Sequence, residues 1–244
     1  MFELLSDPTV WASFLTLVVL EIVLGVDNVI FISITAARLP VEQRRTARMA
    51  GLTLALVMRV LLLFSIAWLA SLTRPILTVF GFDFSWRDLI LLAGGLFLIY
   101  KASTEIFDEV EGEEAEHSSV AAGFAAVIAQ IIVLDLIFSL DSVITAVGIA
   151  DRLEVMVAAV VIAILVMMVA AEPIAAFVEA HPSTKMLALA FLVMVGMALV
   201  ADGFQVHVER GFIYAAMLFA GAVEALNLIR ARRRRGTARA APRP

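Results

Sequence analysis

The chain contains no cysteine and few charged residues, and each shortage excludes a class of protein. Without cysteine there is no disulfide framework, zinc–thiolate centre, iron–sulfur site or thiol catalysis. Only 17% of the 244 residues are charged, and 62% are apolar, whereas a soluble domain carries about 25% charged residues. With a mean hydropathy of +1.00, this composition excludes a water-soluble globule and predicts a membrane protein.

Long apolar stretches occupy most of the sequence. About 20 mostly apolar residues in an α-helix cross a hydrocarbon core of roughly 30 Å. We expect seven spans, at residues 9–37, 49–72, 89–103, 120–150, 153–178, 186–201 and 212–229. No basic segment precedes the first stretch and no small-residue cleavage site follows it, so we interpret it as a permanent span rather than a signal peptide. The predicted fold class is an all-α polytopic membrane protein with seven transmembrane helices.

The basic residues predict the orientation. If the N-terminus lies outside, thirteen of the eighteen Lys and Arg residues fall on the inner side and four on the outer side. The remaining one, Arg59, lies within the second span. Since basic residues near span ends stay preferentially in the cytoplasm, the N-terminus is predicted to be out and the C-terminus in.

Two charged segments lie between or after the spans. Residues 105–119 hold seven carboxylates between Glu105 and Glu116, which predicts a solvated cytoplasmic linker; the alternative is that they gather cations near a pore mouth. Residues 230–244 form an Arg-rich cytoplasmic tail. Because this tail directly follows a membrane helix, we expect it to hold the C-terminus on the cytoplasmic side of the membrane. We expect it to contact anionic lipid rather than nucleic acid.

An eleven-residue pattern occurs twice. Residues 20–30 and 134–144 align without a gap: Leu, acid, three apolar residues, a small residue, an apolar residue, Asp, an amide or hydroxyl, Val and Ile. This predicts a duplication of three helices, residues 1–104 and 120–208, with 209–229 as an added seventh helix. Because three crossings are an odd number, the two copies are inverted. Inverted repeats are typical of secondary transporters, whose ion site lies between the copies near the membrane midplane.

The repeated acids are the predicted site. They are Glu21 and Asp27 in the first copy and Asp135 and Asp141 in the second. Six residues of helix separate each pair by about 9 Å along the axis and about 120° around it, so the two acids do not share one face.

A helix break would bring each pair together. We expect such breaks at Gly25 and Ser139, which would rotate the second Asp toward the first acid and free backbone carbonyls. The first span is also longer than the hydrocarbon core requires, so it must tilt, protrude or break.

Apart from residues within two positions of a span end, the spans hold six acids and one cation. Each ionised residue at a helix centre costs about 2.5 to 3.5 kcal/mol on insertion scales, so the acids must be protonated, hydrated or neutralised by a bound cation. Neutralisation by a cation explains why four of the acids occur in matched pairs, although protonated acids that hold helices together are the alternative. The accessory candidates are Asn28, Ser142, Glu172, Glu224 and Arg59.

Several accessory candidates have simpler interpretations. Glu172 and Glu224 lie near the cytoplasmic ends of their spans and can reach water there. Arg59 either pairs structurally with one of the acids or acts as an internal cation that competes with the substrate. All three histidines fall in loops and cysteine is absent, so the ligands within the spans are oxygen atoms, with methionine sulfur as the alternative. Oxygen ligands favour Mn²⁺, Mg²⁺ or Ca²⁺ over Zn²⁺ or Cu⁺.

The two acidic segments, 21–30 and 135–144, resemble the paired signature of the TerC family of integral membrane proteins. The resemblance extends over essentially the whole chain. The family is named for tellurite resistance and is grouped with LysE-like exporters; several bacterial members are manganese exporters of the cytoplasmic membrane. The resemblance implies a multi-pass protein of the bacterial cytoplasmic membrane that exports Mn²⁺, with Glu21, Asp27, Asp135 and Asp141 as the metal site.

The leading hypothesis is therefore a secondary transporter that exports a divalent cation, Mn²⁺ foremost, in exchange for protons. We expect Mn²⁺ to be a transported substrate and no cofactor to be tightly bound. The alternatives are a membrane scaffold that aids protein insertion or metallation, and a tellurite-resistance factor without ion transport. An enzyme is not expected, because the sequence lacks a phosphate-binding loop, an HExxH metal motif and a GxSxG nucleophile elbow.

Overall fold

The computed structural model describes residues 7–65, 73–79, 82–111, 123–149 and 152–240. Within these ranges a few side chains are left out, among them those of Asp27 and Asp141. Residues 66–72 of the predicted second span and residues 112–119 of the predicted linker lie outside the described residues.

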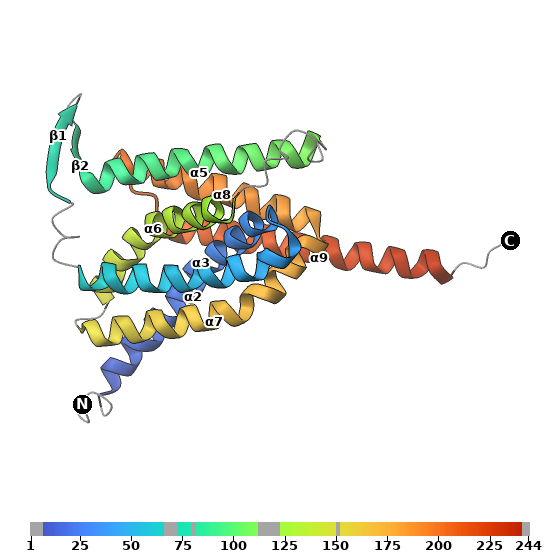
Figure 1. Cartoon of the computed structure of the whole chain (residues 1–244), viewed down its shortest axis with the longest axis horizontal. Helices are drawn as coiled ribbons and strands as arrows, with labels where there is room; N and C mark the ends of the chain where they lie inside the picture. Colours follow the sequence, from blue (N-terminus) through green and yellow to red (C-terminus); the bar gives the residue numbers. More distant parts are fainter. Residues whose placement is uncertain (1–6, 66–72, 80–81, 112–122, 150–151, 241–244) are drawn as a thin grey trace.

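The described chain is almost entirely helical, as predicted. Its elements are α2 (Pro8–Ala37), α3 (Val41–Phe64), β1 (Pro75–Val79), β2 (Phe82–Ser85), α5 (Trp86–Glu111), α6 (Phe124–Ile149), α7 (Leu153–Ala180), α8 (Pro182–Gly203) and α9 (Arg210–Ala240). The helices form an elongated bundle with the hairpin at one end, and α9 projects beyond the bundle at the other (Figure 1). We call these ends the hairpin end and the arginine end, because Arg38, Arg44 and Arg48 lie at the latter.

Most of the predicted spans correspond to helices of sufficient length. Among the residues searched, six helices are long and apolar enough to cross a membrane: α2, α3, α5, α7, α8 and the part of α9 at Gly211–Ala231. The remaining predicted span corresponds to α6, which is an apolar helix over Phe124–Ser139 and continues to Ile149. The chain is thus a polytopic helical membrane protein.

The bundle is apolar on its outside. Val169 on α7 is 80% exposed, and Leu218 and Phe219 on α9 are 77% and 72% exposed. Polar side chains lie inside instead, including Glu21, Arg59 and Asp135. This distribution is the reverse of a soluble protein's and suits a surface that contacts lipid.

The predicted breaks at Gly25 and Ser139 are wrong, because α2 and α6 continue as helices through these positions. Gly25 serves packing instead. A Cβ atom at this position would lie 2.2 Å from Sδ of Met167 on α7, so a larger residue would require that side chain to move. Unbroken, the 30 residues of α2 span about 45 Å, and the helix runs obliquely to α3 and α7 (Figure 1).

Helices α5 and α8 cross at two glycines. A Cβ atom on Gly95 would lie 2.6 Å from the carbonyl oxygen of Gly196, and one on Gly196 would lie 2.9 Å from that of Gly95. The helices are antiparallel, since Asp88 at the start of α5 lies beside Gly203 at the end of α8. Small residues at this crossing let the two backbones approach closely, as in other membrane helix pairs.

The other large helix contacts pair the two halves of the chain crosswise. Helix α2 packs against α7, and α3 packs against α6. Gly51 of α3 lies against Ile131 of α6, where an added Cβ atom would approach the isoleucine within 2.9 Å. The predicted copies are therefore interleaved and do not form separate domains.

A two-stranded hairpin between α3 and α5 was not predicted. Strands β1 and β2 are antiparallel, and an isolated hairpin of this kind is marginally stable in water. Here the loop after α8 supports it: the ring centroids of Phe84 and Phe204 lie 6.2 Å apart, and Nε2 of Gln205 donates to the carbonyl oxygen of Asp83.

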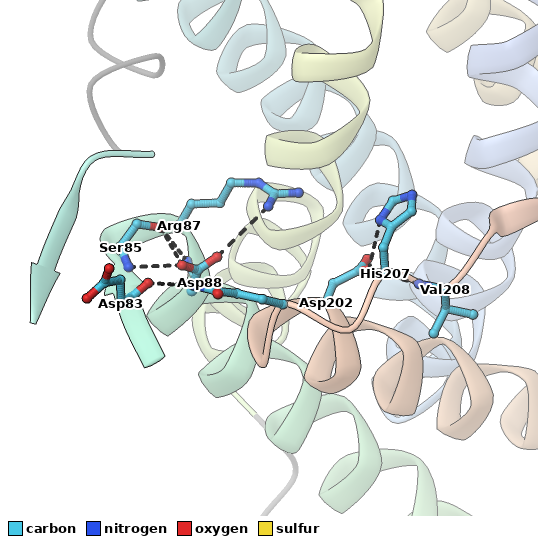
Figure 2. A network of polar contacts seen from close by, with 8 residues as sticks. Asp83, Ser85, Arg87, Asp88, Asp202, His207 and Val208 are labelled. Atoms are coloured by element: carbon cyan, nitrogen blue, oxygen red, sulfur yellow. Dashed lines mark hydrogen bonds and ion pairs between the residues drawn. The ribbon is translucent and has the colours of Figure 1, made fainter. Parts of the chain in front are cut away.

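Polar side chains fix the helix ends beside the hairpin (Figure 2). The backbone N–H and hydroxyl of Ser85 donate to Oδ2 of Asp88 at 2.9 and 2.7 Å, and the Asp88 N–H donates back to the Ser85 hydroxyl at 3.2 Å. This reciprocal arrangement is a capping box at the start of α5. At the end of α8, Nδ1 of His207 lies 3.4 Å from Oδ1 of Asp202.

Two predicted boundaries differ at the arginine end. Helix α5 continues to Glu111, so the first seven residues of the predicted linker are helical. Their carboxylates find cations on neighbouring helices, since Glu105 pairs with Arg38 and Glu109 with Lys185. Helix α9 likewise continues to Ala240, through most of the predicted Arg-rich tail.

Candidate functional site

Arg59 of α3 is the centre of the candidate site. Its side chain is 3% exposed, and it lies on the face of α3 that is buried against the bundle. A guanidinium in such a position requires anionic partners, because an unpaired buried charge is strongly destabilising. Its partners therefore identify the polar interior of the protein.

Arg59 bridges two acids that come from different halves of the chain. Its Nη1 forms an ion pair with Oε2 of Glu21 on α2. Its Nη2 donates to Oδ1 of Asp135 on α6 at 3.0 Å. Glu21 is 1% exposed and Asp135 is 5% exposed. The first acids of the two repeated segments thus meet at one cation near the middle of their helices.

Hydroxyl groups complete the surroundings of these acids. The Ser139 hydroxyl donates to Oδ2 of Asp135 at 3.2 Å. Ser142 lies close to Glu21, and its hydroxyl donates to the carbonyl oxygen of Ser139 at 3.3 Å. Ser142 therefore places the second repeated segment beside the acid of the first. Both serines are buried.

Two buried polar atoms of the candidate residues have no hydrogen-bond partner in the described part of the chain. They are Oδ1 of Asn28 and Nε of Arg59. Asn28 is 6% exposed and follows Asp27 on α2. An unmade hydrogen bond at a buried group costs about 1 to 3 kcal/mol. A further group that donates to Oδ1 of Asn28 or accepts from Nε of Arg59 would therefore be stabilising.

The second acids of the repeat, Asp27 and Asp141, have side chains outside the described residues. Their backbones belong to the continuous helices α2 and α6, six residues after Glu21 and Asp135 respectively. They are thus about 9 Å further along their helices. Their role as ligands stays a prediction.

Two accessory candidates lie elsewhere. Glu172 of α7 has a side chain that is 59% exposed and pairs with Nη2 of Arg48 at 2.9 Å. Oε1 of Glu224 on α9 accepts from the Ser183 hydroxyl at 2.5 Å at the start of α8. The structure thus places Arg59 and Ser142 beside the predicted acids and gives Glu172 and Glu224 other partners. Asn28 adjoins Asp27 on α2 and lines a pocket with residues of α6, α8 and α9.

The arrangement can hold a cation by exchange. Glu21, Asp135 and Arg59 carry a formal charge of −1 together, and removing the guanidinium would leave two carboxylates facing one another. Within the described residues no three side chains of His, Cys, Asp and Glu gather as a ready-made metal site. Oxygen ligands from carboxylate, amide and hydroxyl groups suit Mn²⁺, Mg²⁺ or Ca²⁺.

The sequence-based prediction gave Arg59 one acid as a partner. In the structure Arg59 bridges two acids. The lone cation in an apolar span was the signal, but only the packing of α2, α3 and α6 shows that both acids reach it. Ser139 was also missed as a partner of Asp135, although a spacing of four residues on a helix places the two on one face.

Comparison with known proteins gives the family. The integral membrane protein TerC family matches residues 6–238. The chain belongs to the TerC family.

Among relatives of this TerC-family protein, the UPF0053 inner membrane protein YgdQ of Escherichia coli is 56% identical over 230 residues, which cover 94% of this chain and 97% of YgdQ. A UPF0053 protein of Haemophilus influenzae is 53% identical over 93% of this chain and 97% of its own length. The UPF0053 inner membrane protein YoaE of Escherichia coli is 51% identical over 93% of this chain, but this covers only 44% of YoaE.

No solved structure matches the chain. The relatives named as inner membrane proteins, together with the six candidate spans, identify this TerC-family chain as a multi-pass protein of the bacterial inner membrane.

Proposed function

We propose that this TerC-family protein is a secondary transporter that exports a divalent metal cation, with Mn²⁺ as the foremost substrate. The observation that carries the proposal is the bridge at Arg59, where Glu21 of the first repeated segment and Asp135 of the second meet one buried cation. A carboxylate from each copy at one point is what a shared ion site between two repeats requires.

The pairing of helices supports inverted repeats. If the copies are related by a two-fold axis, α2 corresponds to α6, α3 to α7, and α5 to α8. A contact of α2 with α7 then requires a contact of α6 with α3, and both contacts are present. The antiparallel crossing of α5 and α8 at Gly95 and Gly196 has the symmetry expected where such an axis passes.

The arrangement of the ends supports the proposed orientation. The first residues of α2 and the last of α9 lie at opposite ends of the long axis (Figure 1), as an odd number of crossings requires. We assign the arginine end to the cytoplasm, because basic residues near span ends stay there preferentially. In this orientation the Arg-rich end of α9 faces the inner leaflet, where anionic lipid attracts it.

In the proposed mechanism Arg59 acts as a tethered substitute for the metal. While the site is empty, the guanidinium neutralises Glu21 and Asp135. A divalent cation that enters displaces it and is held by Glu21, Asp27, Asp135 and Asp141, with Asn28 and Ser142 as additional oxygen donors. Protons compete for the same carboxylates, so export of the metal can be coupled to proton uptake. The metal is cargo, and the mechanism requires no catalytic step and no resident cofactor.

Cellular manganese content tests the proposal. In a bacterial strain that lacks its own manganese exporters, expression of the protein should lower cellular manganese under manganese stress. Glu21→Gln and Asp135→Asn should abolish this effect, because each keeps the shape of the side chain but removes a charge from the site.

Glu224→Gln is the matched control, since Glu224 accepts from the Ser183 hydroxyl away from the site and a glutamine oxygen can still accept. It should retain most of the activity. Full activity in both site variants, at equal amounts in the membrane, would reject the proposed site. A protein that leaves manganese unchanged but still supports tellurite tolerance or membrane protein assembly would favour the alternative functions.

A further inference from the structure

A cavity of about 230 Å³ opens at the arginine end of the bundle. It is lined from α2 by Ser33 and Ala37 and from the surrounding helix ends by four charged side chains, which are Arg44, Glu109, Glu179 and Lys185. None of these six residues belongs to the site at Arg59. The cavity lies beside the last turns of α2, the helix that also carries Glu21 and Asp27.

The four charged side chains form two ion pairs across the predicted repeats. Nη1 of Arg44 on α3 lies 3.5 Å from Oε1 of Glu179 on α7, and Lys185 on α8 pairs with Glu109 on α5. Each pair therefore joins a helix of the first copy to a helix of the second. Movement of one copy against the other would break both pairs.

These pairs are well suited to reversible opening. The side chains of Arg44 and Glu179 are 29% and 43% exposed, and those of Lys185 and Glu109 are 30% and 27% exposed. Ion pairs in contact with water contribute little net stability, because solvation compensates their loss. They differ in this from the pairs of Arg59, which are almost fully buried.

The size and charge of the cavity fit a hydrated divalent cation. Six water molecules at about 30 Å³ each occupy roughly 180 Å³, which is less than the volume of the cavity. The two carboxylates bring two negative charges, and the guanidinium and ammonium neutralise them while no ion is present. Ser33 lies six residues beyond Asp27 on α2, which places it about 9 Å from that acid along the helix.

We propose that this cavity is a second cation site, a cytoplasmic vestibule that receives the hydrated divalent ion before it reaches the acids at the centre. In the vestibule the ion replaces Arg44 at Glu179 and Lys185 at Glu109, and the loss of these pairs frees the two copies to separate at this end. This inference rests on the proposed transport function and assigns its cytoplasmic access site.

Cysteine labelling tests the vestibule directly, because the natural chain contains no cysteine. Ser33→Cys places one thiol on the cavity wall, and the reaction rate with a membrane-impermeant cationic thiol reagent is measured from the cytoplasmic face of inside-out vesicles. Ala37→Cys is a second reporter in case the first variant fails to fold. Ala163→Cys, on a fully buried core position of α7, is the control.

Breaking the pairs should open the cavity. With Arg44→Gln and Lys185→Gln together, the thiol at residue 33 or 37 should react about tenfold faster, and the thiol at residue 163 should not change. Exchanging the charges of one pair, with Arg44→Glu and Glu179→Arg, should restore slow labelling relative to Arg44→Glu alone. Unchanged rates at both reporters, or no restoration by the exchange, would overturn the gating role of the pairs.

Manganese chloride tests the assignment to a divalent cation. Saturating Mn²⁺ on the cytoplasmic face should slow labelling at residue 33 by the cationic reagent several-fold, with a smaller effect on a neutral reagent. Glu109→Gln together with Glu179→Gln should remove this protection. Equal rates with and without Mn²⁺ would overturn the cation site. Since labelling does not depend on transport, protection without manganese flux would show that the vestibule binds the ion while the proposed transport function fails.

Discussion

Replacement of Arg59 by glutamine is the most informative single perturbation of the central site. The variant removes the cation shared by Glu21 and Asp135 and leaves two carboxylates that are 1% and 5% exposed. Breaking a buried ion pair by removing one partner destabilises a protein by about 3 to 5 kcal/mol. We therefore expect Arg59→Gln to insert into the membrane but to unfold more easily than the natural protein.

The size of the effect can be compared with a control on the same helix. For a chain of this length, each kcal/mol shifts the midpoint of thermal unfolding by about 2 to 4 °C, so Arg59→Gln should lower Tm by about 6 to 20 °C. Arg48→Gln removes another buried guanidinium, but its partner Glu172 is 59% exposed and can be solvated. We expect a smaller decrease in Tm for Arg48→Gln.

Manganese should reverse the effect of Arg59→Gln. The vacated carboxylates can bind the ion without competition from the guanidinium, and a ligand at a hundred times its Kd adds about 2.7 kcal/mol of stability. The assay is thermal unfolding of the purified protein in detergent, with and without Mn²⁺ and with Mg²⁺ as a comparison. Two results would each refute the reasoning: a variant as stable as Arg48→Gln, or a Tm that Mn²⁺ raises no more than in the natural protein.

The remaining predictions concern the second acids, the helix crossing and protons. Asp27→Asn and Asp141→Asn should leave the protein inserted and folded but abolish manganese export; normal export by either variant in the cellular assay would exclude that acid from the site. Gly95→Val should separate α5 from α8 and lower Tm strongly, because even a Cβ atom would lie 2.6 Å from the Gly196 carbonyl oxygen. Gly221→Val should leave Tm nearly unchanged, since the space around residue 221 is open. Equal Tm values for the two variants would contradict the crossing. Apparent Mn²⁺ affinity should weaken as pH falls, since protonated carboxylates are poor ligands; an affinity that does not vary with pH would contradict carboxylate ligation.

The helical membrane architecture could be predicted because it follows from local properties. A run of about 20 apolar residues has few structural alternatives in a bilayer, where backbone polar groups must be satisfied within the segment. The ends of the helices could not be predicted as well. Charged residues at 105–111 extend α5 because Arg38 and Lys185, far away in the sequence, approach them.

The candidate site was partly predictable. The repeated acids could be found by aligning the chain with itself, and Arg59 was conspicuous as a cation near the centre of an apolar span. The expected break at Gly25 was wrong because glycine weakens a helix but also permits close packing, and only the position of Met167 decides between these roles. The partners of Glu172 and Glu224 likewise depend on contacts between helices that no local pattern indicates.

The cytoplasmic vestibule was beyond the reach of the sequence for a related reason. Its four charged residues lie on four different helices, and the pattern of the acidic segment alone indicated a solvated linker. Glu109 pairs with Lys185, which is 76 residues away along the chain. The distinction between a solvated carboxylate and one that lines a cavity thus depends on tertiary structure.

Manganese flux in proteoliposomes tests the central claim most directly. The purified protein is reconstituted into vesicles that contain a manganese-sensitive dye or a pH-sensitive dye, and a manganese gradient is applied. We predict manganese movement accompanied by proton movement in the opposite direction, and neither movement with Asp135→Asn. The absence of manganese flux in the natural protein, or equal flux in the natural protein and the Asp135→Asn variant, would contradict the account.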